Sequence, residues 1–115
     1  MPAESLPTAV NQFRKRHGDV WKAFNDLGES CHQAGPPDEK TRRLVKLALS
    51  IGAGLEGATH SAARNARKSG VSTDEMEHVA LLSITTLGLP AATRAWTWIA
   101  DPKYWTFARA PRQPS

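Results

Sequence analysis

Residues 66–82 read ARKSGVSTDEMEHVALL, and this stretch decides the class of the fold. Gly70 follows a run of helix-forming residues, at the place where a left-handed glycine commonly closes a helix. Ser72 and Glu75 have the S-x-x-E spacing of a capping box, which begins a new helix. The stretch therefore predicts a helix, a glycine turn and a second helix.

Helical spacing continues on both sides of this turn. Apolar residues recur three and four positions apart along most of the chain, which predicts amphipathic helices. Gly18, the run 35–37 (GPP) and Gly88 separate these helices, because glycine and consecutive prolines interrupt helical geometry. We expect about six helices and no strand, and hence one all-α domain over residues 1–115.

The apolar rows of the predicted helices are expected to form the core. Cys31 ends one such row and Trp96 lies in another, so both side chains are expected to face inward. The alanine-rich segment 55–69 has a narrow apolar stripe that permits close helix packing. Because Cys31 is the only cysteine, an internal disulfide and any Cys-x-x-Cys site are excluded.

Composition excludes several classes of protein. With 40% hydrophobic and 23% charged residues the chain is expected to fold, and its net charge of +4 is scattered as on a solvated surface. A helix-turn-helix around Gly70 is disfavoured, since Asp74, Glu75 and Glu77 would face the phosphates. No signal peptide or apolar stretch of about 20 residues is evident, so we expect a cytoplasmic protein without nucleic-acid or membrane partners.

From Gly35 to Ile99 the chain resembles the carboxymuconolactone decarboxylase family, which includes the alkylhydroperoxidase D-like proteins. The resemblance is carried by these segments together: 38–40 (DEK), 44–49 (LVKLAL), 60–66 (HSAARNA), 68–72 (KSGVS), 74–79 (DEMEHV) and 88–92 (GLPAA). It implies an all-α core over residues 35–99 and a homo-oligomer, a trimer or hexamer, with sites near subunit contacts. The segment 103–115 is then a C-terminal tail.

The resemblance also implies where the chemistry of the peroxidase branch would lie. That branch uses a Cys-x-x-Cys, a histidine and a glutamate, and these positions fall here on Leu55, Ala58, Ala62 and Arg43. A peroxidatic cysteine must ionise and then be resolved by a second thiol, which leucine and alanine cannot do. We therefore expect a family member without dithiol peroxidase activity.

The remaining polar residues suggest acid/base chemistry on a small organic acid. Glu56 and His60 lie four apart, so a carboxylate could orient an imidazole as a catalytic pair. Arg64 is a candidate for holding a substrate carboxylate, and the enzyme would then be a decarboxylase-like lyase. Two alternatives stay open: a solvated surface pair, and a catalytically silent oligomer that binds a small ligand or a protein.

His78 is a second candidate substrate-binding residue. It follows Glu75 at the Glu-x-x-His spacing of helical metal sites, but one copy is insufficient and Glu75 is engaged in the capping box. No metal or cofactor is therefore predicted. His17 and His32 are interpreted as helix-end residues without a function.

Aromatic residues are concentrated near the C-terminus. The cluster consists of Trp96, Trp98, Tyr104 and Trp105. Core packing or a subunit contact would explain it, and so would a ring-lined pocket for a small apolar or aromatic ligand.

Overall fold

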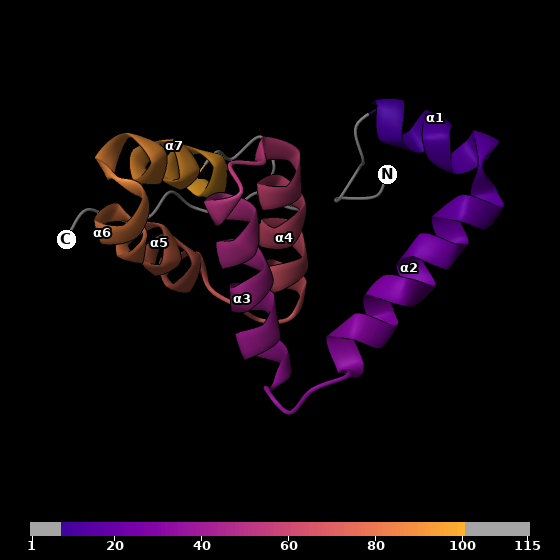
Figure 1. Cartoon of the computed structure of the whole chain (residues 1–115), viewed down its shortest axis with the longest axis horizontal. Coiled ribbons are helices and arrows are strands. Elements are labelled where there is room, and N and C mark those ends of the chain that lie inside the picture. The colour runs from indigo at the N-terminus through magenta and orange to yellow at the C-terminus, as the bar shows by residue number, and fades with distance from the viewer. Residues whose placement is uncertain (1–7, 101–115) are drawn as a thin grey trace.

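The computed structural model describes residues 8–100, and every regular element in this range is a helix (Figure 1). The elements are α1 (Thr8–Arg16), α2 (Gly18–Gln33), α3 (Glu39–Gly52), α4 (Glu56–Lys68), α5 (Thr73–Leu82), α6 (Ile84–Leu87) and α7 (Leu89–Ala100). The predicted all-α class is thus confirmed over the described range. The tail 103–115, with Tyr104 and Trp105, lies outside the described residues.

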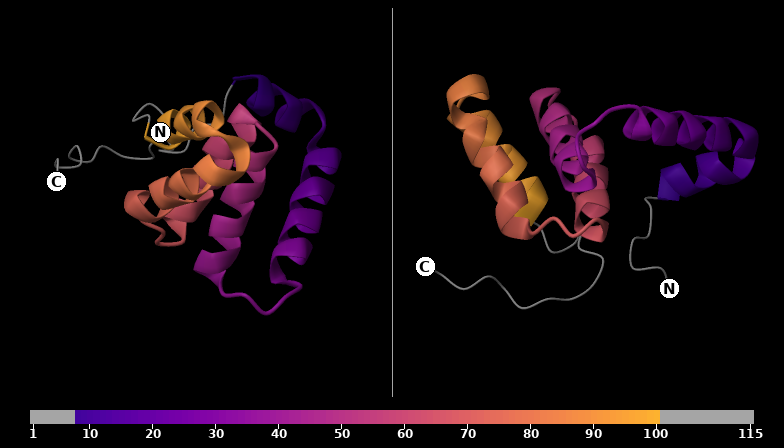
Figure 2. Two further views of the ribbon diagram at one scale, coloured as in Figure 1. Left: turned by 60° about the vertical axis from the view of Figure 1, so that its left-hand side comes forward. Right: turned by 90° about the horizontal axis from the view of Figure 1, so that it is seen from below.

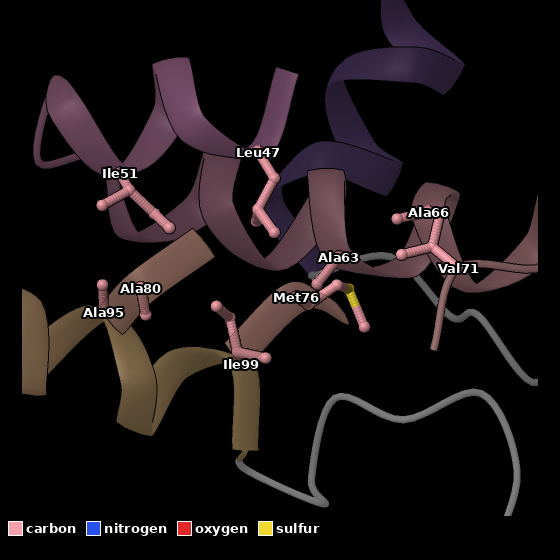
Figure 3. Close-up of a cluster of buried hydrophobic side chains, with 9 residues drawn as sticks. All are labelled: Leu47, Ile51, Ala63, Ala66, Val71, Met76, Ala80, Ala95 and Ile99. Atoms are coloured by element: carbon pink, nitrogen blue, oxygen red, sulfur yellow. The ribbon is translucent and has the colours of Figure 1, made fainter. Parts of the chain in front are cut away.

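Helices α3, α4, α5 and α7 pack around one core (Figure 3). Leu47, Met76 and Ile99 are fully buried at its centre, and small side chains on α4 allow the neighbouring helices to come close. The core side chains are Leu47, Ile51, Ala63, Ala66, Val71, Met76, Ala80, Ala95 and Ile99. The apolar rows of the central helices therefore do meet, as their spacing predicts.

Helices α1 and α2 form a hairpin that projects from this body (Figures 1 and 2). Neither helix has a buried residue, and the radius of gyration of 14.8 Å exceeds the roughly 13 Å of a compact domain of about 100 residues. The expectation that Cys31 is a core residue is wrong, because its thiol is exposed. Periodicity places the apolar residues of α2 on one face, but it does not indicate whether another element covers that face.

Trp96 also departs from expectation. Helix α7 buries Ala92, Ala95 and Ile99, whereas Trp96 is 43% exposed. Trp96 stands four positions after Ala92 and three before Ile99, so it lies at the edge of the same stripe, where the packing of α7 does not cover it. The bulky indole is therefore left at the surface.

The turn between α4 and α5 has the predicted local geometry. Gly70 has φ +89°, and the Val71 amide donates to the Ala66 carbonyl at 2.9 Å, which closes α4 as a Schellman motif. Ser72 and Glu75 make both hydrogen bonds of the capping box. The predicted fifth helix, in contrast, is interrupted at Ser83, so α5 and the four-residue α6 are separate.

No helix within residues 8–100 combines the length and the apolar composition that a bilayer span requires.

Candidate functional site

A pocket of about 570 Å³ opens between α2 on one side and α3 with α4 on the other, and we call it the α2–α3–α4 pocket. Its apolar wall includes Phe24, Val45, Ala58 and Ala62. Pockets of about 300–1,000 Å³ with an apolar lining and a few polar groups are typical small-molecule sites. This pocket is therefore the candidate site within the described part of the chain.

Three of the positions that correspond to the peroxidase relay line this pocket. Ala58 and Ala62 lie on its α4 wall and Arg43 on its α3 wall, whereas Leu55 precedes α4 and is 53% exposed. The place of the second cysteine and of the histidine is thus taken by methyl groups. Cys31 also lines the pocket, but its thiol has no second cysteine in the chain with which to form a disulfide.

Lys46 is the available cation of the pocket. It is exposed on α3, and no ion pair joins it to any residue in the range 8–100. Arg43 donates from Nε to Glu39 at 2.9 Å, and Arg42 donates to the carbonyl of Pro37 and contacts Glu39 at 3.5 Å. Both arginines are therefore committed to protein acceptors, and Lys46 is left for a ligand.

Glu39 is the centre of a polar network beside the pocket. Its Oε1 lies 2.7 Å from Nε2 of His32, and its Oε2 accepts from the Ser69 hydroxyl at 2.6 Å and from Arg43 at 2.9 Å. The Ser69 hydrogen bond, then those of His32 and Arg43, hold the pKa of the Glu39 carboxyl far below its usual range. The carboxylate thereby ties the end of α2 and the end of α4 to the first turn of α3.

Comparison with known families identifies the domain. A model of the carboxymuconolactone decarboxylase family matches residues 18–101, which is most of the chain. The chain belongs to the carboxymuconolactone decarboxylase family. No curated protein and no solved structure matches it. Because the match begins at residue 18, the projecting α2 is part of the family domain.

The predicted pair Glu56 and His60 does come together in this family member. His60 Nε2 lies 3.4 Å from Glu56 Oε2, and the imidazole meets the Trp98 ring edge-on with the centroids 6.4 Å apart. The alternative of a solvated pair is wrong for His60, whose side chain is 6% exposed, although Glu56 is 59% exposed. His60 faces the helical body, on the side of α4 away from the α2–α3–α4 pocket, and does not line that pocket.

Arg64 and His78 are not brought to the pocket either. Arg64 is half-buried on α4, and His78 is exposed on α5. Glu75 is occupied by the capping box and lies 3.6 Å from Lys40. Among residues 8–100, no three His, Cys, Asp or Glu side chains are grouped to hold a metal ion.

The aromatic cluster is only partly described. Trp98 is half-buried between His60 and the Arg94 guanidinium, which lies 5.6 Å from its ring centre. Trp96 is exposed, and neither indole lines the α2–α3–α4 pocket. Within the described residues these rings pack against helices and do not form the pocket wall.

Sequence reasoning missed the residues that do surround the pocket. His32 and Glu39 are seven positions apart across the glycine-proline loop, so no helical spacing joins them. Lys46 was visible only as one cation on a charged helix face. Asp38 caps α3 by accepting from the Thr41 amide. A glutamate just after this cap and a histidine just before the loop were the available signals, and neither indicates a contact by itself.

Proposed function

We propose that this member of the carboxymuconolactone decarboxylase family binds a small organic acid in the α2–α3–α4 pocket. The observation that carries the proposal is an exposed Lys46 with no described counter-ion, in the lining of a pocket whose wall also includes apolar side chains. An ammonium group beside a pocket of this kind favours a ligand with one carboxylate and a short carbon skeleton.

Two polar groups of the α4 wall support an oxygen-rich ligand, whereas Glu29 on the α2 wall is the carboxylate of the lining. Ser61 and Asn65 line the α4 wall and offer a hydroxyl and an amide. Ala58 and Ala62 leave room where the peroxidase branch would carry reactive groups. We therefore propose binding and acid/base chemistry at this pocket, without dithiol peroxidase activity.

The test uses a short oxo acid and its neutral analogue. Calorimetry is expected to detect binding of levulinate (4-oxopentanoate) and to show that its amide binds more weakly. Lys46→Ala should weaken levulinate binding about tenfold, since a hydrogen bond to a charged group contributes about 1.5–3 kcal/mol. Lys15→Ala on α1 removes the same charge away from the pocket and should bind as the wild type does. Equal binding of acid and amide, or an unaffected Lys46→Ala variant, would contradict the proposal.

A decarboxylase-like reaction at Glu56 and His60 is the second candidate. It is favoured by the burial of an imidazole beside a carboxylate, with Arg64 on the same helix as a candidate to hold the substrate. His78, exposed on α5, is the second substrate-binding residue of this candidate. His60→Gln would abolish turnover of the true substrate here, whereas a catalytically silent ligand-binding protein would show binding without turnover in either form.

We also propose that the chain functions as a homo-oligomer, a trimer or hexamer. Large apolar side chains remain exposed on α2 and around α6, and monomeric soluble proteins rarely leave extended apolar surface uncovered. A second copy of the chain would bury these side chains.

A further inference from the structure

We infer that His32 transfers protons to and from the ligand of the α2–α3–α4 pocket, and that Glu39 is the residue that positions it. This inference rests on the proposed binding of a small organic acid there. It assigns an acid/base role to a histidine that sequence analysis left without a function.

The geometry of His32 supports this assignment. The residue lies near the end of α2 and lines the pocket, yet its side chain is only 7% exposed. Its Nε2 is 2.7 Å from Glu39, and no residue in the range 8–100 hydrogen-bonds to its Nδ1. Nδ1 is therefore the ring nitrogen left for a bound molecule.

Glu39 determines which ring nitrogen carries the proton. Ser69 and Arg43 both donate to its Oε2, and this keeps the carboxyl ionised. An ionised carboxylate only accepts hydrogen bonds, so Nε2 of a neutral His32 must be the protonated nitrogen. The lone pair is then on Nδ1, as a general base at this position requires.

Two observations distinguish the pair His32 and Glu39 from the pair His60 and Glu56. The imidazole–carboxylate contact is 2.7 Å in the His32 pair and 3.4 Å in the His60 pair. Only His32 lines the α2–α3–α4 pocket. A group that exchanges protons with a bound ligand must reach that ligand, which favours His32.

The expected step is proton exchange next to a carbonyl group of the bound acid. Lys46 is placed to hold the carboxylate. Nδ1 of His32 takes the proton as the C–H bond breaks, and the electron pair of that bond moves to form the enolate, whose negative charge lies on the carbonyl oxygen. The resulting imidazolium returns a proton to the same carbon, and no oxidant, reductant or metal enters the balance.

The test measures levulinate in deuterium oxide by proton NMR. The wild-type protein should accelerate loss of the signal of the protons next to the ketone. His32→Gln should lower this exchange by about a hundredfold, within the usual contribution of a general base, while levulinate still binds. His17→Gln replaces a histidine at the other end of α2 and should exchange as the wild type does.

Two further variants address positioning and folding. Glu39→Gln should lower the exchange rate and leave the dissociation constant of levulinate unchanged, which a merely structural loss would not do. Imidazole added to His32→Ala should restore exchange, provided that circular dichroism shows an intact helical fold. Unchanged exchange in His32→Gln, or bound levulinate that never exchanges, overturns the inference alone. Absence of levulinate binding in the wild type overturns the proposed function and this inference with it.

Discussion

At the scale of single residues, Glu39 joins parts of the chain that lie far apart in sequence. It contacts His32 on α2, accepts a hydrogen bond from Ser69 after α4, and is itself in the first turn of α3. A carboxylate in that turn is also favoured by the helix dipole. The Glu39 side chain thus holds the projecting hairpin near the body and determines which ring nitrogen of His32 carries the proton.

Glu39 should make stability depend on acidity. Its pKa is lowered in the folded chain by hydrogen bonds from Ser69, His32 and Arg43, whereas an unfolded glutamate has a pKa of about 4.3. A lowered folded-state pKa contributes stability that is present above the unfolded pKa and is lost as the pH falls below it. Urea unfolding is therefore expected to show falling stability from about pH 5 downward.

The variant Glu39→Gln should flatten this acid dependence and lower stability at pH 7. Glu29→Gln is the matched control, since Glu29 is an exposed residue of α2 that accepts only from Gln33. It should leave the acid dependence unchanged. An equal response of the two variants would show that Glu39 is not the group responsible.

At the scale of elements, glycine conformation separates α4 from α5. Gly70 has φ +89° and Gly57 lies inside α4, and an added Cβ would meet no atom within 4 Å at either position. Gly70→Ala should destabilise the fold by about 1–2 kcal/mol, the cost of left-handed geometry for an L-residue. Gly57→Ala should stabilise it by up to about 1 kcal/mol, because helix propensity rises.

Thermal or urea unfolding of these two variants measures the difference. At both positions the added methyl group contacts no other part of the protein, so stability changes of opposite sign would reflect backbone conformation alone. A Gly70→Ala variant as stable as the wild type would mean that the Schellman turn tolerates a side chain.

Boundaries that depend on capping chemistry were predictable. Asp38 caps α3 by accepting from the Thr41 amide at 2.8 Å, and Ser72 with Glu75 caps α5. Both use short polar side chains that bond to a backbone amide three residues on, and such pairs are visible in sequence. The break at Ser83 was missed because nothing in its local sequence is a strong helix terminator.

At the scale of the whole molecule, exposed apolar side chains lie on two separate parts. Val20 and Leu27 on α2 are 57% and 62% exposed, and Leu82 on α5 is 62% exposed. Figures 1 and 2 show α2 and the α5–α6 corner on opposite sides of α3 and α4. Two separate contact faces would allow closed assemblies larger than a dimer.

Light scattering after size exclusion tests this assembly. The wild type should elute as a trimer or hexamer, and Leu82→Glu or Leu27→Glu should shift it to smaller species, because a charge buried in an interface is unfavourable. Gln12→Glu is the control, since Gln12 is an exposed polar residue on α1, outside both faces. A monomeric wild type at micromolar concentration would contradict the proposal.

The sequence alone determined the helical class, the turn at Gly70, the capped starts of α3 and α5, and the absence of a dithiol. These properties depend on residue type and on spacings within one helix or one turn, so they can be recognised without distant contacts.

The tertiary structure decided which face of each helix is buried and which face lines the pocket. It turned Ala58 and Ala62 to the pocket and His60 to the body, and it brought His32 to Glu39 across the loop between α2 and α3. A helix repeats every 3.6 residues whatever surrounds it. Its pattern therefore separates two faces, but only packing against other elements determines which face is buried and which meets a ligand.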